Sequence, residues 1–311
     1  MASGDLVALT GATGFIGTTL SRELRQRGLR VRALVRDARR ADMLAAQGVE
    51  LVTGDLSDRA ALGRLVEDAA AVVHAAGAVR GACAADFDRV NVAGTEAVCA
   101  ALAAAAPQAR LLLVSSLAAR EPQLSWYAHS KRAAEEVVHS APVQDWVIVR
   151  PPAVYGPGDR EMLPVFNAMR RGWAPVPGAC EARFSLVYVD DLCRALADCL
   201  ASPAAAGGTF TPCDGHPGGY DWREACAIAA EVFKRPVRPL VVPAPLLNAV
   251  AATNLGLARL RGSLPMLTPP KLRELRHTDW TADNAGLTEV TGWRPAIDLR
   301  AGLEILFGEA A

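Results

Sequence analysis

The chain has 311 residues, of which 51% are hydrophobic, and carries 33 basic and 33 acidic side chains. This length allows a large sheet with a smaller appended lobe, and the balanced charge argues against a nucleic-acid partner. The seven cysteines form no CxxC pair, which argues against a disulfide framework and a metal site. No signal peptide is indicated, and no apolar run reaches the ~20 residues of a membrane span. We therefore expect a cytoplasmic protein that acts on a small molecule.

Short apolar runs alternate with longer amphipathic ones in residues 1–150, which predicts a parallel sheet with helices on both faces. The expected strands are 6–9, 31–35, 50–53, 71–74, 111–115 and 147–150, and the expected helices are 18–26, 41–47, 60–66, 90–105 and 127–140. Proline and glycine become frequent after Arg150, which indicates a second lobe over the sheet's carboxyl edge. The prediction is an α/β, doubly wound parallel-sheet Rossmann fold. Residues 1–150 would form its dinucleotide-binding domain, and 151–311 a smaller mixed substrate lobe with some chain returning to the sheet.

The run TGATGFIG at residues 10–17 follows the first strand and leads into the first helix. Glycines permit a tight turn and a close approach of the backbone to a pyrophosphate, while the helix N-terminus faces the anion. An ordinary β-α turn is the alternative, but the order of strand, turn and helix favours a dinucleotide. The candidate cofactor-binding residues here are Gly11, Thr13, Gly14, Phe15, Ile16 and Gly17.

Tyr127 and Lys131 are four residues apart at the start of an expected helix, so their side chains share one face. A free tyrosine has a pKa near ~10, and a neighbouring cation favours the phenolate. Ser116 ends an expected strand eleven residues earlier and could converge with them on one carbonyl. Ser115 is better explained as a strand-end hydrogen bond or cap. These residues are the candidate catalytic set Ser116, Tyr127 and Lys131.

The chain resembles the extended branch of the short-chain dehydrogenase/reductase superfamily, which includes nucleotide-sugar epimerases and 3β-hydroxysteroid dehydrogenase-like enzymes. The resemblance covers nearly the whole chain. It rests on residues 10–17, 54–56, 74–77, 91–95, 115–116, 150–158 and 188–192, with Tyr127 and Lys131. It implies that Tyr127 donates and accepts the proton, that Ser116 orients the reacting oxygen, and that Lys131 lowers the pKa of Tyr127 and holds the nicotinamide ribose.

The same resemblance implies further cofactor contacts and two structural residues. Asp55 and Leu56 would lie beside the adenine, Ala75, Ala76 and Gly77 would pass under the ribose and pyrophosphate, and Pro151 would touch the nicotinamide end. Asn91 would tie a helix to the sheet, and His74 would end a strand rather than catalyse.

Arg36 ends the second expected strand, where an NAD-selective fold usually places an aspartate on the ribose 2′-hydroxyl. An arginine suits a 2′-phosphate, and Arg39 and Arg40 add positive charge, so NADP(H) is favoured over NAD(H). Asp37 weakens this argument, and a solvated basic face is the alternative.

Nucleotide-sugar enzymes of this branch usually carry an arginine that clamps the substrate diphosphate a few residues before the Val-Asp-Asp motif. Phe184 takes that position here, although Arg183 is its neighbour. Residues 239–267 are unusually apolar and fit a lipid-like or aromatic substrate, a peripheral membrane contact, core packing or a dimer contact. The expected helices 90–105 and 127–140 are candidates for pairing in a homodimer.

These features predict an NAD(P)-dependent oxidoreductase that moves a hydride between nicotinamide and a carbonyl or secondary alcohol of an apolar substrate, steroid-like, terpenoid or aromatic. One alternative is a nucleotide-sugar epimerase or dehydratase with tightly bound NAD. A second is a non-catalytic NADP-binding sensor or scaffold, which would have no need of Ser116, Tyr127 and Lys131 together.

Overall fold

The main sheet has seven parallel strands in the order β11-β6-β5-β4-β1-β2-β3, seen in a computed structural model that describes residues 1–308, apart from the side chain of Arg40. The strands are β1 (Leu6–Thr10), β2 (Arg30–Val35), β3 (Glu50–Thr53), β4 (Ala71–His74), β5 (Arg110–Val114), β6 (Trp146–Val149) and β11 (Thr209–Phe210). The strand order reverses between β1 and β4, since β1 pairs with β2 on one side and with β4 on the other. This crevice is where doubly wound sheets bind nucleotides.

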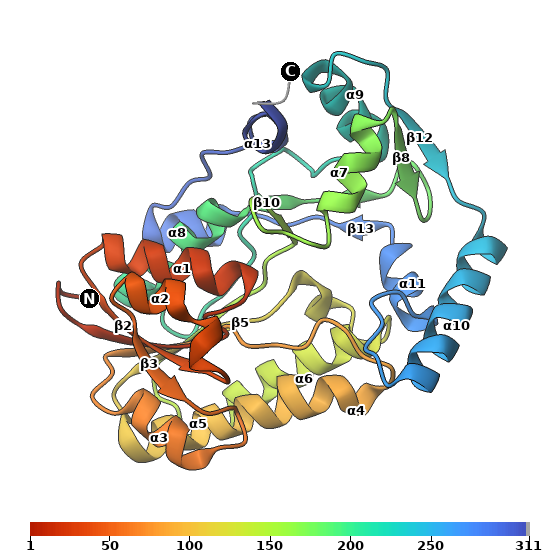
Figure 1. Cartoon of the computed structure of the whole chain (residues 1–311). Helices are drawn as coiled ribbons and strands as arrows, with labels where there is room; N and C mark the ends of the chain where they lie inside the picture. Colours follow the sequence, from red (N-terminus) through yellow and green to blue (C-terminus); the bar gives the residue numbers. More distant parts are fainter. Residues whose placement is uncertain (309–311) are drawn as a thin grey trace.

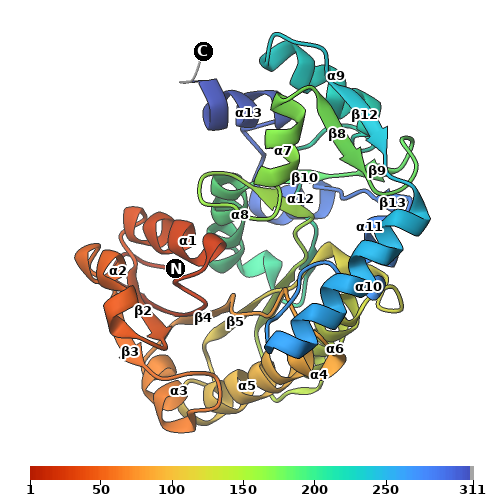
Figure 2. The ribbon, with the colours of Figure 1, turned by 45° about the vertical axis from the view of Figure 1, so that its right-hand side comes forward.

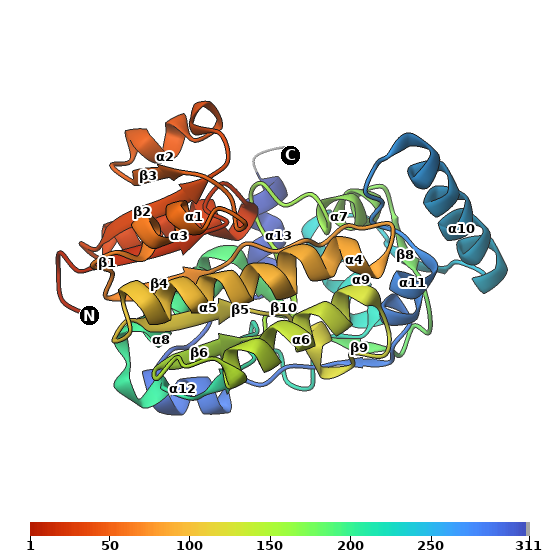
Figure 3. The same ribbon diagram turned by 90° about the horizontal axis from the view of Figure 1, so that it is seen from below.

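Helices cover both faces of the sheet, as their buried apolar residues require (Figure 1). One face carries α1 (Phe15–Gln26), α2 (Asp42–Ala46) and α8 (Val189–Ala201), and the other carries α3 (Arg59–Val66), α5 (Ala93–Ala105) and α6 (Trp126–Ser140). Figure 3 shows α5 and α6 running side by side. The predicted fold class is therefore confirmed.

The C-terminal lobe has its own apolar core, which includes Tyr155, Tyr188 and Tyr220. Its three two-stranded sheets pair β7 (Ala153–Tyr155) with β10 (Leu186–Tyr188), β8 (Trp173–Val176) with β12 (Arg238–Val241), and β9 (Arg183–Phe184) with β13 (Asp279–Trp280). Its helices are α7 (Leu163–Arg170), α9 (Trp222–Val232), α10 (Ala244–Arg261), α11 (Pro269–Leu275) and α13 (Leu299–Phe307), while α12 (Ala285–Thr291) packs beside the main sheet. Figure 2 shows α10 beside α11, and α11 packs on α6, which also contacts α4 (Ala84–Phe87).

The largest difference from the sequence prediction lies in residues 90–105, expected as one helix. The structure has α4, then a π-helical stretch, Asp88–Val92, and only then α5. Asn91 explains the change, because its buried side chain bonds to the backbone of Ala78 and to Ser130 instead of facing solvent. Such π-turns within helices are common at functional sites.

Three short 3₁₀ turns, Ala38–Arg40, Leu117–Arg120 and Pro203–Ala205, join the larger elements. Within residues 1–308, no helix combines the length and apolar character needed to span a membrane.

Candidate active site

The glycine turn between β1 and α1 packs tightly against the segment after β4 at Gly11, and it is open at Gly14. A Cβ on Gly11, whose φ is +75°, would lie 2.6 Å from the amide nitrogen of Ala76. A Cβ on Gly17 would overlap the carbonyl oxygen of Gly11. Gly14 instead caps α1 and is exposed beside exposed Thr13, so the free amides of the first turn of α1, at Phe15 and Ile16, face open space. This cradle fits a pyrophosphate.

The segment after β4 lies against this turn through a buried hydrogen-bond network. Thr10 Oγ1 pairs with His74 Nδ1 at 2.7 Å and accepts the amide of Ala76 at 3.2 Å. His74 ends β4, as predicted. Burial, together with the charge of Lys131, lowers its pKa to about 3. His74 is therefore a neutral structural group that holds residues 75–77 under the cradle.

This buried histidine predicts a loss of stability in acid. The pKa of His74 is lower in the folded chain than the ~6.5 of a free histidine, so below pH ~6.5 the unfolded chain binds an additional proton and stability falls with pH. By pH 5 the contribution is about 2 kcal/mol. The free energy of unfolding is measured in urea at pH 7 and at pH 5. Between these pH values it should fall by about 2 kcal/mol less in His74→Asn than in the wild type. His139→Asn, at an exposed histidine, is the matched control; equal losses in all three proteins would contradict the assignment.

Arg36, Asp55 and Leu56 meet at the carboxyl ends of β2 and β3. Asp55 accepts hydrogen bonds from the hydroxyl and amide of Ser57, which lower its pKa, and Arg36 contributes to the same shift. Leu56 packs so closely on α5 that a Cβ on Gly94 would lie 2.6 Å from it. This group can receive an adenosine moiety.

Exposed Arg39 adds positive charge close to Arg36 in the chain, and its backbone amide donates a hydrogen bond to Asp37. The side chain of Arg40, the third arginine of the sequence argument, lies outside the described residues.

The three predicted catalytic side chains are brought together at the carboxyl ends of β4 and β5. Ser125 caps α6 by accepting the amide of Ala128, so Tyr127 and Lys131 lie on the first turns of that helix. The Ser116 hydroxyl hydrogen-bonds with the half-buried Tyr127. Lys131 is buried, and its ammonium donates to the carbonyl of Val114 at 3.0 Å.

Lys131 also lies close to the predicted ribose-binding segment. A Cβ on Gly77 would be 3.1 Å from Lys131 Nζ, so the absence of a side chain at Gly77 gives this ammonium its place. Pro151, buried after β6, accepts the amide of Leu117 and thereby braces the turn that carries Ser116. These residues could hold the ribose and nicotinamide of a dinucleotide.

The pKa values of the site differ from the sequence expectation. Burial raises the pKa of Tyr127 to about 12, with a smaller increase from Glu274 and an opposing effect of the Ser116 hydrogen bond. The sequence predicted a decrease caused by Lys131. Burial also lowers the pKa of Lys131 to about 8, against the attraction of Glu135. Burial therefore dominates both groups.

A second layer of buried polar groups stands behind the site. Ser115 donates to Glu135, and Arg150 donates to both carboxylate oxygens of Glu135. Ser115 thus has the strand-end hydrogen-bonding role that the sequence favoured. Asn91 donates to Ser130, which in turn donates to the carbonyl of Tyr127, so the π-helical stretch is tied to α6.

The structure adds site residues that the sequence reasoning missed. Lys271 of α11 lies with its ammonium 5.0 Å from the centre of the Tyr127 ring and is paired with Glu274. Glu274 is nearly buried and accepts the hydroxyl of Ser125, the cap of α6. The i,i+3 spacing of Lys271 and Glu274 was visible, but nothing local showed that α11 packs against α6.

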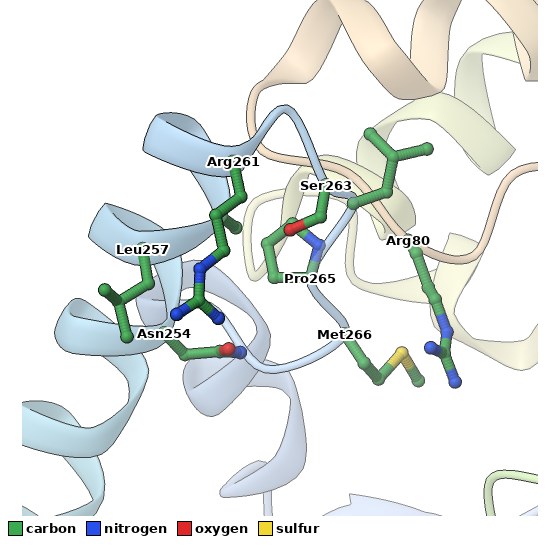
Figure 4. A pocket seen from close by; sticks show the side chains of 9 residues that line it. Arg80, Asn254, Leu257, Arg261, Ser263, Pro265 and Met266 are labelled. Carbon is green, nitrogen blue, oxygen red and sulfur yellow. The ribbon is translucent and has the colours of Figure 1, made fainter.

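Two cavities share a lining residue, and the smaller of them lies beside Tyr127. The smaller is lined by Tyr127 with Val79, Phe87, Ser125, Trp126, Met266, Thr268 and Lys271. The larger, of about 370 Å³, is lined by Arg80, Asn254, Leu257, Ala258, Arg261, Ser263, Leu264, Pro265 and Met266. Met266 lines both cavities, and the smaller one, of about 10 Å³, has room for no more than a water molecule. Figure 4 shows the larger cavity, with α10 on one side and Arg80 on the other.

Comparison with known proteins places this geometry in a family. Residues 7–210 match the model of the NAD dependent epimerase/dehydratase family. The chain belongs to this family. It is an oxidoreductase of the extended short-chain dehydrogenase/reductase type, and the family is NAD(P)-dependent, as the resemblance implied.

Two curated relatives are reductases. The chain is 40% identical to a ceramide reductase of Caulobacter vibrioides over 91% of its own length and 88% of the relative's. It is 31% identical to the 4-hydroxy-2-methyl-3-oxo-4-farnesyl-3,4-dihydroquinoline-1-oxide ketoreductase of Stigmatella aurantiaca, over 85% and 84% of the two chains.

Solved structures show the same fold at low identity. MoeE5, solved in complex with UDP-glucuronic acid and NAD, has a TM-score of 0.72 at 23% identity over 98% of this chain and 99% of that one. The epimerase Mth375 of Methanothermobacter thermautotrophicus has a TM-score of 0.76 at 20% identity over 99% and 93%.

Proposed function

We propose that this protein is an NAD(P)H-dependent ketoreductase that converts a ketone on a long-chain, ceramide-like lipid into a secondary alcohol. The observation that carries the proposal is the meeting of the Ser116 and Tyr127 hydroxyls near buried Lys131, with a cavity of about 370 Å³ close by at α10. Residues 1–150 would bind the dinucleotide and residues 151–311 the substrate.

The chemistry rests on Tyr127 as the acid. A nicotinamide, when bound, supplies the hydride that reaches the carbonyl carbon. The carbonyl oxygen takes the proton of Tyr127, while Ser116 orients that oxygen by hydrogen bonding. With a pKa of about 12 the phenol is protonated at neutral pH and so carries the proton that the carbonyl oxygen would receive. Lys131 would hold the ribose, and its positive charge would stabilise the phenolate that forms when Tyr127 loses its proton.

The lining of the smaller cavity supports an amphipathic substrate. Val79, Phe87 and Met266 offer apolar contacts, whereas Lys271 and Thr268 offer polar ones close to the phenol. This mixture suits a ketone next to a polar head. Both reductase relatives carry names of long-chain or prenylated compounds, which agrees with this substrate class.

A nucleotide sugar is less well supported. Arg183, the nearest candidate for a diphosphate clamp, is paired with Glu224 at 2.7 Å. Phe184 packs with Tyr220 and Trp222 in the apolar core of the lobe.

NADP(H) is our proposed cofactor, because exposed Arg36 lies where a 2′-phosphate is expected in this fold.

The test is a nucleotide titration followed by a substrate comparison. The purified protein is titrated with NADPH and NADH by nicotinamide fluorescence, and nucleotide retained after purification is identified by mass. Turnover is then measured with a keto analogue of ceramide in detergent micelles and with UDP-glucose. NADPH consumption with the lipid ketone supports the proposal. Retained NAD with conversion of UDP-glucose and no net cofactor turnover would replace it with an epimerase.

A further inference from the structure

Helix α10 is an apolar helix that the fold leaves largely uncovered. Only Ala251 and Ala258 of its residues are buried, and the helix packs beside α11. Leu246 is 55% exposed, Val250 47%, Leu257 43% and Leu260 85%. Figure 3 shows α10 projecting from the edge of the molecule. Soluble chains rarely expose apolar side chains in such a continuous group without a function.

The exposed side chains form one ridge. Leu246, Val250, Thr253, Leu257 and Leu260 follow one another at alternating spacings of four and three residues, which keeps them on one side of a helix. The ridge points away from the face that holds Ala251 and Ala258. We call these five residues the α10 ridge.

The sequence around the ridge is basic. Residues 232–273 contain no aspartate or glutamate but seven lysines and arginines, in a chain whose net charge is zero. Arg261 is exposed beside the ridge in the last turn of α10, whereas the guanidinium of Arg259 donates to the carbonyl of Ala82. Long cationic side chains beside an apolar face reach lipid phosphates while their stems stay in the interface.

The ridge lies beside the mouth of the larger cavity. Leu257 belongs to the ridge and lines the cavity, and Arg261 and Arg80 stand on its two sides (Figure 4). Met266 lines both this cavity and the small one at Tyr127. A bilayer held at the ridge would therefore lie on the side of the molecule where the larger cavity opens.

We propose that α10 docks the protein on the surface of an anionic lipid bilayer, with its ridge in the interface and Arg261 on lipid phosphates. Delivery of the substrate through this contact rests on the proposed function, whereas docking itself does not. Interfacial helices bind by buried apolar area together with attraction to anionic lipids.

The test is flotation of the full chain with vesicles, without nucleotide. Vesicles of phosphatidylcholine alone are compared with vesicles that contain equal amounts of phosphatidylcholine and phosphatidylglycerol. The wild type should float with the anionic vesicles and lose this association in high salt. The variant Leu246→Glu/Leu260→Glu, at two exposed residues that do not line the cavity, should float about tenfold less. Met43→Glu/Ile305→Glu, also at two exposed apolar residues, is the matched control and should float like the wild type.

Turnover separates docking from catalysis. The ridge variant should reduce a water-soluble short-chain ketone as fast as the wild type, but should be slower with a keto lipid embedded in anionic vesicles. Loss of flotation only in the ridge variant supports docking whatever the substrate proves to be. Flotation that is absent in the wild type or equal in both variants overturns it. A dimer of the wild type that the ridge variant dissociates, without flotation, would assign the ridge to a second copy of the chain.

Discussion

Tyr127→Phe is expected to reduce ketone turnover by about 10²- to 10⁴-fold, the range that a positioned general acid contributes. The change removes the hydroxyl that pairs with Ser116 but keeps the ring, which packs edge-on against Phe87 under the ammonium of Lys271. Folding and nucleotide affinity should therefore remain close to those of the wild type. Steady-state kinetics with NADPH, together with a fluorescence titration of the nucleotide, measure the two effects separately.

The matched control is Tyr188→Phe, which removes a hydroxyl from a buried tyrosine in the core of the C-terminal lobe. It should leave turnover nearly unchanged. If Tyr127→Phe kept the turnover of the wild type, the proton would have another source and the catalytic assignment would be wrong. A parallel loss of nucleotide binding would instead show that the phenol acts on the cofactor site.

The direction of the reaction can be examined through pH. Reduction needs the protonated phenol, and this is the state of Tyr127 at neutral pH, because burial raises its pKa to about 12. The sequence did not indicate this increase, because the burial that causes it comes from packing around α6. The lysine four residues away was the local signal, and burial outweighs it.

The parts of the fold that the sequence predicted are those set by local pattern. The predicted strands 50–53 and 71–74 match β3 and β4, because turn residues on both sides of a short apolar run define where the strand begins and ends. The glycine turn and the i,i+4 spacing of Tyr127 and Lys131 on a helix are local patterns that can be read from the sequence. The structure places Ser116 beside Tyr127. Their chemical roles remain predictions.

The parts that the sequence missed depend on distant contacts. Glu274 reaches Ser125 across 149 positions of the chain, and the π-helical turn at Asn91 exists because that side chain bonds to Ala78 and Ser130. The environment of α10 is another case. Its apolar composition was visible, but only the packing shows that two alanines alone are buried and that the leucines face outward.

Gly17→Ala is expected to destabilise the fold by about 3 kcal/mol and to remove measurable nucleotide binding. The new methyl would overlap the carbonyl oxygen of Gly11 and lie 2.7 Å from the Cα atom of Ala12. Both atoms belong to the backbone of the turn, so neither can rotate aside as a side chain would. Either α1 moves away from the sheet or the turn opens, and in both cases the helix N-terminus no longer faces the phosphate site.

Two other glycines provide the controls, because a Gly→Ala change adds the same methyl group at each position. Gly63→Ala in α3 meets no atom within 4 Å and should be neutral or slightly stabilising. Gly14→Ala has φ −82° and meets only the carbonyl of Gly11, at 3.2 Å, so the chain should fold while its methyl occupies the open side of the cradle. Urea unfolding and NADPH fluorescence should thus separate the three: Gly63→Ala keeps stability and binding, Gly14→Ala loses mainly binding, and Gly17→Ala loses both. A stable Gly17→Ala protein that binds NADPH would show that the turn does not need the close approach on which the whole cradle argument depends.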